Sequence, residues 1–155
     1  MTTLPPGLVD PAEIKGLTGL ELFQGFIAGR FPPPPLTGNI PMRVTEVEYG
    51  VCIWETEAPD WFLNPMGTVH GGYAMAVLDS ALGCSVHTAL DVGEAYTTIE
   101  AKVNMTRPIP RGVTLRCEGR MITKGRRTAT SEAKLFSPEG KVLAFGTSSL
   151  MIFAA

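Results

Sequence analysis

The chain has 155 residues and a formal net charge of −2, and it is 45% hydrophobic and 18% charged. This length suits one domain with a real core and is short for two domains of ordinary size. The composition is typical of a soluble globular protein and not of a disordered one. The absence of a basic excess argues against a nucleic-acid partner.

The cysteines and the apolar runs indicate where the protein works. The three cysteines are odd in number, widely spaced and without a C-x-x-C pair, which is typical of reduced thiols in the cytosol. Residues 1–15 are polar and broken by prolines, unlike a secretory signal. The longest apolar stretch is interrupted by Asp79 and Ser80 and is too short to span a bilayer. We therefore expect a cytoplasmic protein without a membrane partner.

The first elements in chain order are a lead-in, a helix and a hairpin. Residues 1–17 are predicted to be a loose lead-in. Thr18 and Glu21 form a capping-box pattern before apolar residues at helical spacing, which predicts a helix that ends near Gly29. The proline run 32–35 is expected to forbid further helix. Two strand-like runs, 42–47 and 49–57, predict a hairpin, and residues 58–69 predict a loop.

The second half predicts one long helix and four strands. Residues 71–88 are rich in Ala, Met and Leu without proline, which predicts a helix that is buried on several sides. Strands are predicted at 96–107, 113–123, 127–136 and 141–153. Alternation in the first strand places two sets of residues on opposite faces: Ile99, Ala101, Val103 and Met105 on one, Thr98, Glu100, Lys102 and Asn104 on the other.

Tight turns between consecutive strands predict an antiparallel sheet, and a buried helix predicts that the sheet wraps around it. We therefore expect an α+β fold in a single domain over residues 1–155. Residues 1–37 would be the lead-in and helix, and residues 38–155 the core.

The start of the long helix carries a candidate for catalysis. The first amides of a helix have no internal partner and lie at the positive end of its dipole. Gly71 and Gly72 would let another group approach this backbone closely. The N–H of Gly71 is therefore a candidate oxyanion donor, aimed at a carbonyl whose oxygen gains charge during attack.

Asp79 is an acidic residue within an apolar stretch of the same helix. We expect its carboxylate to be at least partly desolvated, which is costly unless it is paired or used. The alternative is a carboxylate that only accepts hydrogen bonds and orients its neighbours. Gly71 and Asp79 are eight residues apart, about 12 Å along one helix. If both act on one carbonyl, they should come from two subunits related by a two-fold axis.

Three further polar residues keep more than one interpretation. His70 either positions a carbonyl or a loop backbone, which we favour, or acts as a general base. Asn64 either caps its loop or positions the attacking water. His87, at the end of the helix, is interpreted as a partner of the helix dipole. The two histidines cannot form a metal site without further ligands, and none is expected.

The run Asn64-x5-His70-Gly71-Gly72-x6-Asp79 resembles the signature of hotdog-fold acyl-CoA thioesterases. It looks closest to the phenylacetate-pathway (PaaI-like) group, which is related to the 4-hydroxybenzoyl-CoA thioesterases, and the similarity covers about residues 40–153. The resemblance implies the hotdog fold and hydrolysis of an acyl-CoA to a free acid and CoA, with no cofactor. It also implies homodimers joined edge to edge, often as a dimer of dimers (homotetramer).

The resemblance implies a role for each matching residue. Asp79 would be the general base or, less favoured, the nucleophile, with Gly71 as oxyanion donor and Asn64 and His70 in support. A hydroxyl residue early in the next strand completes the site, and the matching position is Thr98, with Thr97 as the alternative. The CoA moiety would be met by Gly72, Arg107, Arg111, Lys124, Arg126 and Arg127. Trp61, Phe62 and the helix over 20–27 would line the acyl pocket.

Two rival functions remain at this point. One is a hotdog dehydratase or hydratase, which uses a histidine and an acidic residue as its acid–base pair. The other is a non-catalytic acyl-CoA-binding protein. A serine hydrolase is disfavoured because no Gly-x-Ser-x-Gly elbow is present.

Overall fold

The computed structural model describes residues 4–155. Its elements in chain order are α1 (Pro11–Ile14), α2 (Gly19–Ile27), η1 (Pro35–Gly38), β1 (Met42–Glu48), β2 (Val51–Thr56), η2 (Asp60–Phe62), α3 (Gly71–His87), β3 (Glu94–Met105), β4 (Leu115–Lys124), β5 (Thr128–Phe136) and β6 (Val142–Ala154). The long helix, the hairpin and the four later strands agree with the predictions to within a few residues.

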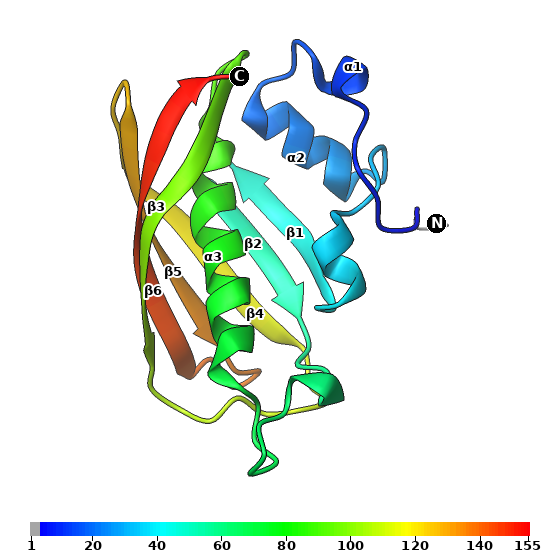
Figure 1. The fold of residues 1–155 in the computed structure, drawn as a ribbon, viewed down its shortest axis with the longest axis vertical. Coiled ribbons are helices and arrows are strands. Elements are labelled where there is room, and N and C mark those ends of the chain that lie inside the picture. Colours follow the sequence, from blue (N-terminus) through cyan, green and yellow to red (C-terminus); the bar gives the residue numbers. More distant parts are fainter. Residues whose placement is uncertain (1–3) are drawn as a thin grey trace.

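Within the described residues, the strands form one antiparallel six-stranded sheet in the order β1-β2-β4-β5-β6-β3. The sheet curves around α3, and β3 forms one of its edges (Figure 1). Nine residues of α3 are buried, which its nearly all-round apolar sequence requires. This arrangement confirms the expected α+β hotdog architecture.

The N-terminal segment is more ordered than predicted. The capping box at Thr18 and Glu21 is present and opens α2. The predicted lead-in contains the one-turn helix α1. Residues 1–3 of the lead-in lie outside the described part of the chain. The proline run does not exclude further helix: η1 begins at Pro35, because proline suits the first position of a helix, where no backbone N–H is needed.

Two contacts seat α3 on the sheet. The Tyr73 hydroxyl lies 2.8 Å from Oγ1 of Thr56, which ties the first turn of α3 to β2. Burial raises the pKa of this phenol to about 12, so it stays protonated. Gly119 of β4 lies directly against the backbone of Ala81, and a Cβ there would meet the Ala81 carbonyl oxygen. The helix start is therefore held firmly in place.

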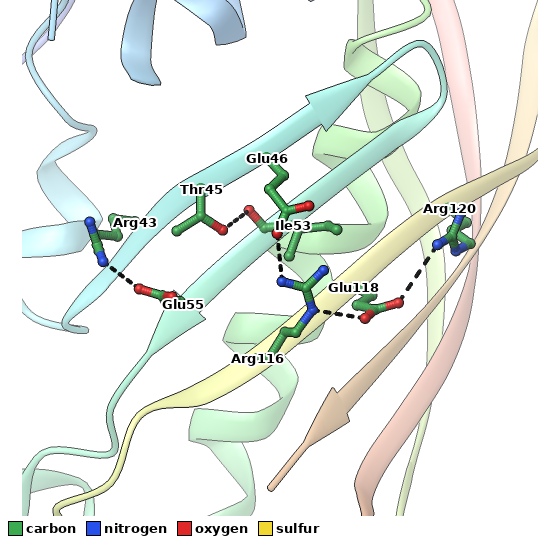
Figure 2. Close-up of polar contacts among 8 residues, drawn as sticks. All are labelled: Arg43, Thr45, Glu46, Ile53, Glu55, Arg116, Glu118 and Arg120. Atoms are coloured by element: carbon green, nitrogen blue, oxygen red, sulfur yellow. Dashed lines mark hydrogen bonds and ion pairs between the residues drawn. The ribbon is translucent and has the colours of Figure 1, made fainter. Parts of the chain in front are cut away.

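Charged side chains cover the outer face of the sheet at β1, β2 and β4 (Figure 2). Arg116 binds Glu46 at 2.7 Å and Glu118 at 2.8 Å, and these hydrogen bonds raise its pKa. Arg43 pairs with Glu55 in the same region. Exposed pairs of this kind contribute little stability individually. The pairing leaves this part of the outer face polar, with each of these charges beside an opposite one.

A bulge in β3 changes the predicted faces of that strand. Thr98 lies opposite Leu150, but Glu100 lies opposite Ser149, so Ile99 is an extra residue in the ladder. Residues directly opposite each other share a face of the sheet. Thr98 therefore lies on the helix side with Ala101, and the predicted grouping of Thr98 with Glu100 is wrong. Strict alternation fails because a bulge shifts the side-chain parity by one residue.

Candidate active site

The helix start presents one free backbone donor. His70 caps α3: its Nδ1 accepts the N–H of Gly72 at 2.9 Å. Among residues 4–155, the N–H of Gly71 donates no hydrogen bond. The side chain of Met105 lies over this position, since a Cβ on Gly71 would meet its sulfur at 2.7 Å. Gly71 therefore offers an unused N–H at the positive end of a 17-residue helix.

The geometry of His70 fits positioning and not base chemistry at Nδ1. Because Nδ1 accepts a hydrogen bond, a neutral His70 carries its proton on Nε2. Its backbone N–H also donates to the carbonyl of Phe62 at 2.7 Å, which fastens the loop before α3. The exposed Nε2 remains available as a donor to a ligand.

Asn64 is committed to its own loop. Its Oδ1 accepts the N–H groups of Met66 and Thr68, and its Nδ2 donates to Oγ1 of Thr68 at 2.7 Å. Gly67 closes the turn with a positive φ of 75°. Of the two predicted roles, the structure fits loop capping, and nothing in the single chain joins this amide to Asp79.

Asp79 and Thr98 are brought together from α3 and β3. Oγ1 of Thr98 donates to Oδ1 of Asp79 at 3.3 Å. Thr97, the alternative, faces outward opposite Met151. Both Asp79 and Thr98 are exposed in the single chain, so the expected desolvation of Asp79 is not found there. The reason is geometric: the sheet covers only one side of α3 (Figure 1), and Asp79 is among the helix residues that it leaves exposed.

Tyr96, which was not among the predicted site residues, lies two residues before Thr98 in β3 and near the charge of Asp79. Its ring packs over Gly83, where a Cβ would meet the hydroxyl at 2.6 Å. Burial, with added effects of Cys84 and the nearby Asp79 charge, raises the pKa of this phenol. Tyr96 therefore stays a hydroxyl beside the carboxylate. A glycine inside an otherwise regular helix is the one sequence signal for such a close approach.

His87 does not act as predicted on the helix dipole. Its ring is packed between Phe23 and Tyr96, with centroids 5.3 and 5.4 Å away. Burial lowers its pKa to about 4, so it is neutral near pH 7. A neutral ring has no charge to place against the helix end, and its role is packing α2 against α3 and β3.

The basic residues predicted to meet CoA do not form one cluster. Lys124 contacts Glu94 at the start of β3 at 2.7 Å, with only 15% of its side chain exposed. Arg126 and Arg127 lie exposed in the next turn, beside an open groove lined also by Met151 and Phe153. Arg107 and Arg111 lie beyond the opposite end of β3, where Arg111 pairs with Asp60 at 3.2 Å.

The residues predicted to line an acyl pocket are also dispersed. Trp61 is 69% exposed and donates to the carbonyl of Asn39. Phe62 packs against Tyr73 near the start of α3. By contrast, α2 packs on β1 and against His87 at the far end of α3. These groups do not enclose a common cavity next to Asp79.

The arrangement supplies two halves of a hydrolytic site. The carboxylate of Asp79 can take a proton from water, and the free N–H of Gly71 can stabilise an oxyanion. Within residues 4–155, no cluster of His, Cys, Asp and Glu could hold a metal ion. None of the described helices has the length and hydropathy needed to cross a membrane.

Comparisons with known proteins agree with this geometry. The family model of the thioesterase superfamily matches residues 66–144, which include α3 and the Asp79–Thr98 pair. No curated protein sequence matches the chain.

Several solved structures share the fold. A phenylacetic acid degradation-related protein of Ralstonia eutropha is 29% identical with a TM-score of 0.75, over 83% of this chain and 98% of that one. A thioesterase family protein of Silicibacter pomeroyi is 21% identical with a TM-score of 0.75, over 86% and 99%. A Streptococcus mutans protein with bound acetyl-CoA is 25% identical with a TM-score of 0.67, over 73% and 89%.

Proposed function

The chain belongs to the thioesterase superfamily and is a thioester hydrolase, and from this premise we propose that it hydrolyses an acyl-CoA at a site shared by two subunits. The observation that carries the proposal is the contact of Thr98 with Asp79 on the same helix whose first N–H, that of Gly71, has no partner within residues 4–155. The bound acetyl-CoA of the Streptococcus mutans structure supports CoA as the carrier.

The proposed reaction needs one base and one oxyanion donor. The oxygen of a water molecule attacks the thioester carbonyl carbon while Asp79 takes a proton from that water. The carbonyl oxygen becomes an oxyanion, which accepts the N–H of Gly71. The tetrahedral intermediate then collapses, the carbon–sulfur bond breaks, and Asp79 returns the proton to the thiolate of CoA. Thr98 holds the carboxylate in place through its hydroxyl.

A second copy of the chain completes the site in this proposal. Gly71 and Asp79 lie two turns apart on α3, and Met75, midway between them, is 51% exposed. A two-fold axis at the level of Met75 would set Gly71 of each subunit against Asp79 of the other. The partner helix would also remove Asp79 from bulk water, as the sequence leads us to expect.

The edge of the sheet supports the same axis. β3 is an edge strand of 12 residues. Such long edges are usually covered or paired. Ile99 and Met105 are 60% and 51% exposed on it. Thr98 lies beside Asp79, and Met105 lies over Gly71, so an axis at Met75 would cross β3 near Ala101. Antiparallel pairing of two β3 strands there would form a homodimer with one continuous sheet.

The same pairing would create a binding site for the nucleotide end of CoA. Arg126 and Arg127 lie at the end of the sheet near the start of β3, and Arg107 lies past its other end. Antiparallel β3 strands bring these two ends, from different subunits, to the same side of the dimer. Exposed guanidinium groups there would bind CoA phosphates with charge-assisted hydrogen bonds.

A thiol-release assay over aromatic, branched, short-chain and medium-chain acyl-CoAs tests the proposed function. We expect turnover on at least one class, and a loss of kcat of about a hundredfold or more in Asp79→Asn, as for a missing general base. Asp91→Asn, an exposed carboxylate after α3, is the matched control and should leave kcat unchanged. An Asp79→Asn variant as fast as the parent would exclude the mechanism.

The two rival functions give different results in the same assay. Offered crotonyl-CoA, a hydratase would add water to the double bond without releasing thiol. An acyl-CoA-binding protein would bind the panel without turnover and would bind equally well as Asp79→Asn.

A further inference from the structure

The bulge at Ile99 decides which residue of β3 faces Asp79. Thr98 is opposite Leu150, a fully buried residue on the helix side, while Glu100 is opposite Ser149 on the outer side. If Ile99 entered the ladder as an ordinary residue, alternation would place Ile99 on the helix side and turn Thr98 outward. The site therefore depends on the bulge staying where it is.

Ser148 of β6 holds this bulge from the helix side. Its Oγ donates to the carbonyl oxygen of Glu100 at 2.8 Å, and the residue is only 3% exposed. A bulge disrupts the regular ladder, and a backbone carbonyl beside it needs a hydrogen-bond partner from elsewhere. The hydroxyl of Ser148 supplies that partner at the residue directly after the bulge.

We propose that Ser148 is a positioning residue for the reaction: its hydroxyl fixes the bulge at Glu100 and thereby keeps Thr98 beside Asp79. The inference rests on the proposed function, because it assumes that the Thr98–Asp79 contact supports catalysis. Ser148 touches neither the substrate nor Asp79 in this account, and its effect passes only through Thr98.

The neighbouring strand offers a matched control. Ser131 of β5 lies directly opposite Ser148 in the ladder and is also fully buried. Its hydroxyl has no hydrogen-bond partner within the described part of the chain. Ser131→Ala removes the same atom from the same layer as Ser148→Ala but breaks no hydrogen bond. Any general effect of deleting a buried hydroxyl appears in both variants.

A double-mutant cycle of Ser148→Ala and Thr98→Val, followed by kcat, KM and the free energy of unfolding, tests the inference. We expect Ser148→Ala to lower kcat by about tenfold with KM unchanged, in line with the loss of one positioning contact. Ser131→Ala and Ser148→Thr, which keeps the hydroxyl, should stay within about twofold of the parent. In the Thr98→Val background, Ser148→Ala should change kcat by less than about twofold, since coupled residues are not additive.

Independent, multiplicative losses from Ser148→Ala and Thr98→Val would overturn the inference, and so would equal effects of Ser148→Ala and Ser131→Ala. If Ser148→Ala alone does not fold, the same substitution is tested in a variant that lacks Ile99. The deletion yields a regular ladder that leaves Thr98 opposite Leu150, so Ser148→Ala should then be silent in kcat. Failure of the proposed function is separate: it would appear as full activity in Asp79→Asn, whatever Ser148 does.

Discussion

Thr98 donates a hydrogen bond to Asp79 across the gap between β3 and α3, and the two residues are 19 positions apart in the sequence. The bond is 3.3 Å long and lies on the open side of the helix. Within the described residues, it is the only hydrogen bond between β3 and Asp79. Whatever orients β3 therefore orients the carboxylate as well.

Replacing Thr98 by valine should lower kcat by about tenfold without unfolding the protein, because the shape is kept and only an orienting hydroxyl is lost. Thr97→Val is the control from the next residue, whose side chain faces outward opposite Met151. Steady-state thiol release and thermal unfolding of both variants check this. Equal kcat in the two variants would show that the hydroxyl on the helix side has no special role.

More of the fold than of the candidate site could be predicted from the sequence. Alternation and turn residues predicted the strands, and the capping box at Thr18 predicted α2, because these signals are local. The bulge at Ile99 has no local signal: it depends on pairing with β6, 50 residues later. The burial of His87 depends in the same way on Phe23. Residue types identified Asp79 and Gly71 as candidates, but only the assembled strands show that Thr98, and not Thr97, meets Asp79.

Gly71→Pro should abolish most of the activity while preserving the helix. Proline fits the first position of a helix and carries no N–H, and His70 already has the extended backbone that precedes proline, with φ −65° and ψ 139°. Loss of one oxyanion donor costs about a hundredfold to a thousandfold in kcat. Gly71→Ala meets the same flexible end of Met105 but keeps the N–H. It should therefore be much less impaired, and similar losses in both variants would argue against an oxyanion role.

Mixing two inactive variants tests whether two subunits share each site. Asp79→Asn and Gly71→Pro are each expected to be inactive as homodimers. A mixed dimer would have one site with both residues intact, so co-expression at equal levels should restore about a quarter of the parent kcat per subunit in a two-fold assembly. The measurement is thiol release before and after subunit mixing. If Gly71 and Asp79 act within one chain, mixing restores nothing.

Arg126 and Arg127 should affect recognition of CoA, and Lys124 should affect stability. The double variant Arg126→Met/Arg127→Met is expected to raise KM by about tenfold, corresponding to the loss of charge-assisted contacts with phosphate. Lys124→Met should leave KM nearly unchanged but lower the free energy of unfolding by about 1–2 kcal/mol, because it breaks the partly buried pair with Glu94.

An acyl-dephospho-CoA substrate, which lacks the 3′-phosphate, tests whether the arginines bind that group. If the arginines bind the 3′-phosphate, the parent should lose affinity when this group is absent, whereas the double arginine variant should not distinguish the two substrates. An equal KM of the parent protein for both substrates would mean that the 3′-phosphate does not contact these arginines.

His87 should make the folded state less stable as the pH falls below about 6.5, the ordinary pKa of histidine. Burial lowers the pKa of native His87 to about 4, so between these two values the unfolded chain binds a proton that the folded chain does not. Stability therefore increases with pH across this window and is fully present above it. The lost free energy near pH 4 is up to about 3 kcal/mol, at roughly 1.4 kcal/mol per unit of pKa difference.

His87→Phe isolates this effect, since phenylalanine fits between the rings of Phe23 and Tyr96 but does not titrate. Urea unfolding of parent and variant at about pH 5 and about pH 7.5 gives the comparison, with the acidic residues common to both. The parent should lose more free energy of unfolding than the variant on acidification, by about 1–2 kcal/mol. Parallel losses would mean that the His87 ring is protonated within the fold at pH 5, and that α2 does not shield it as the structure indicates.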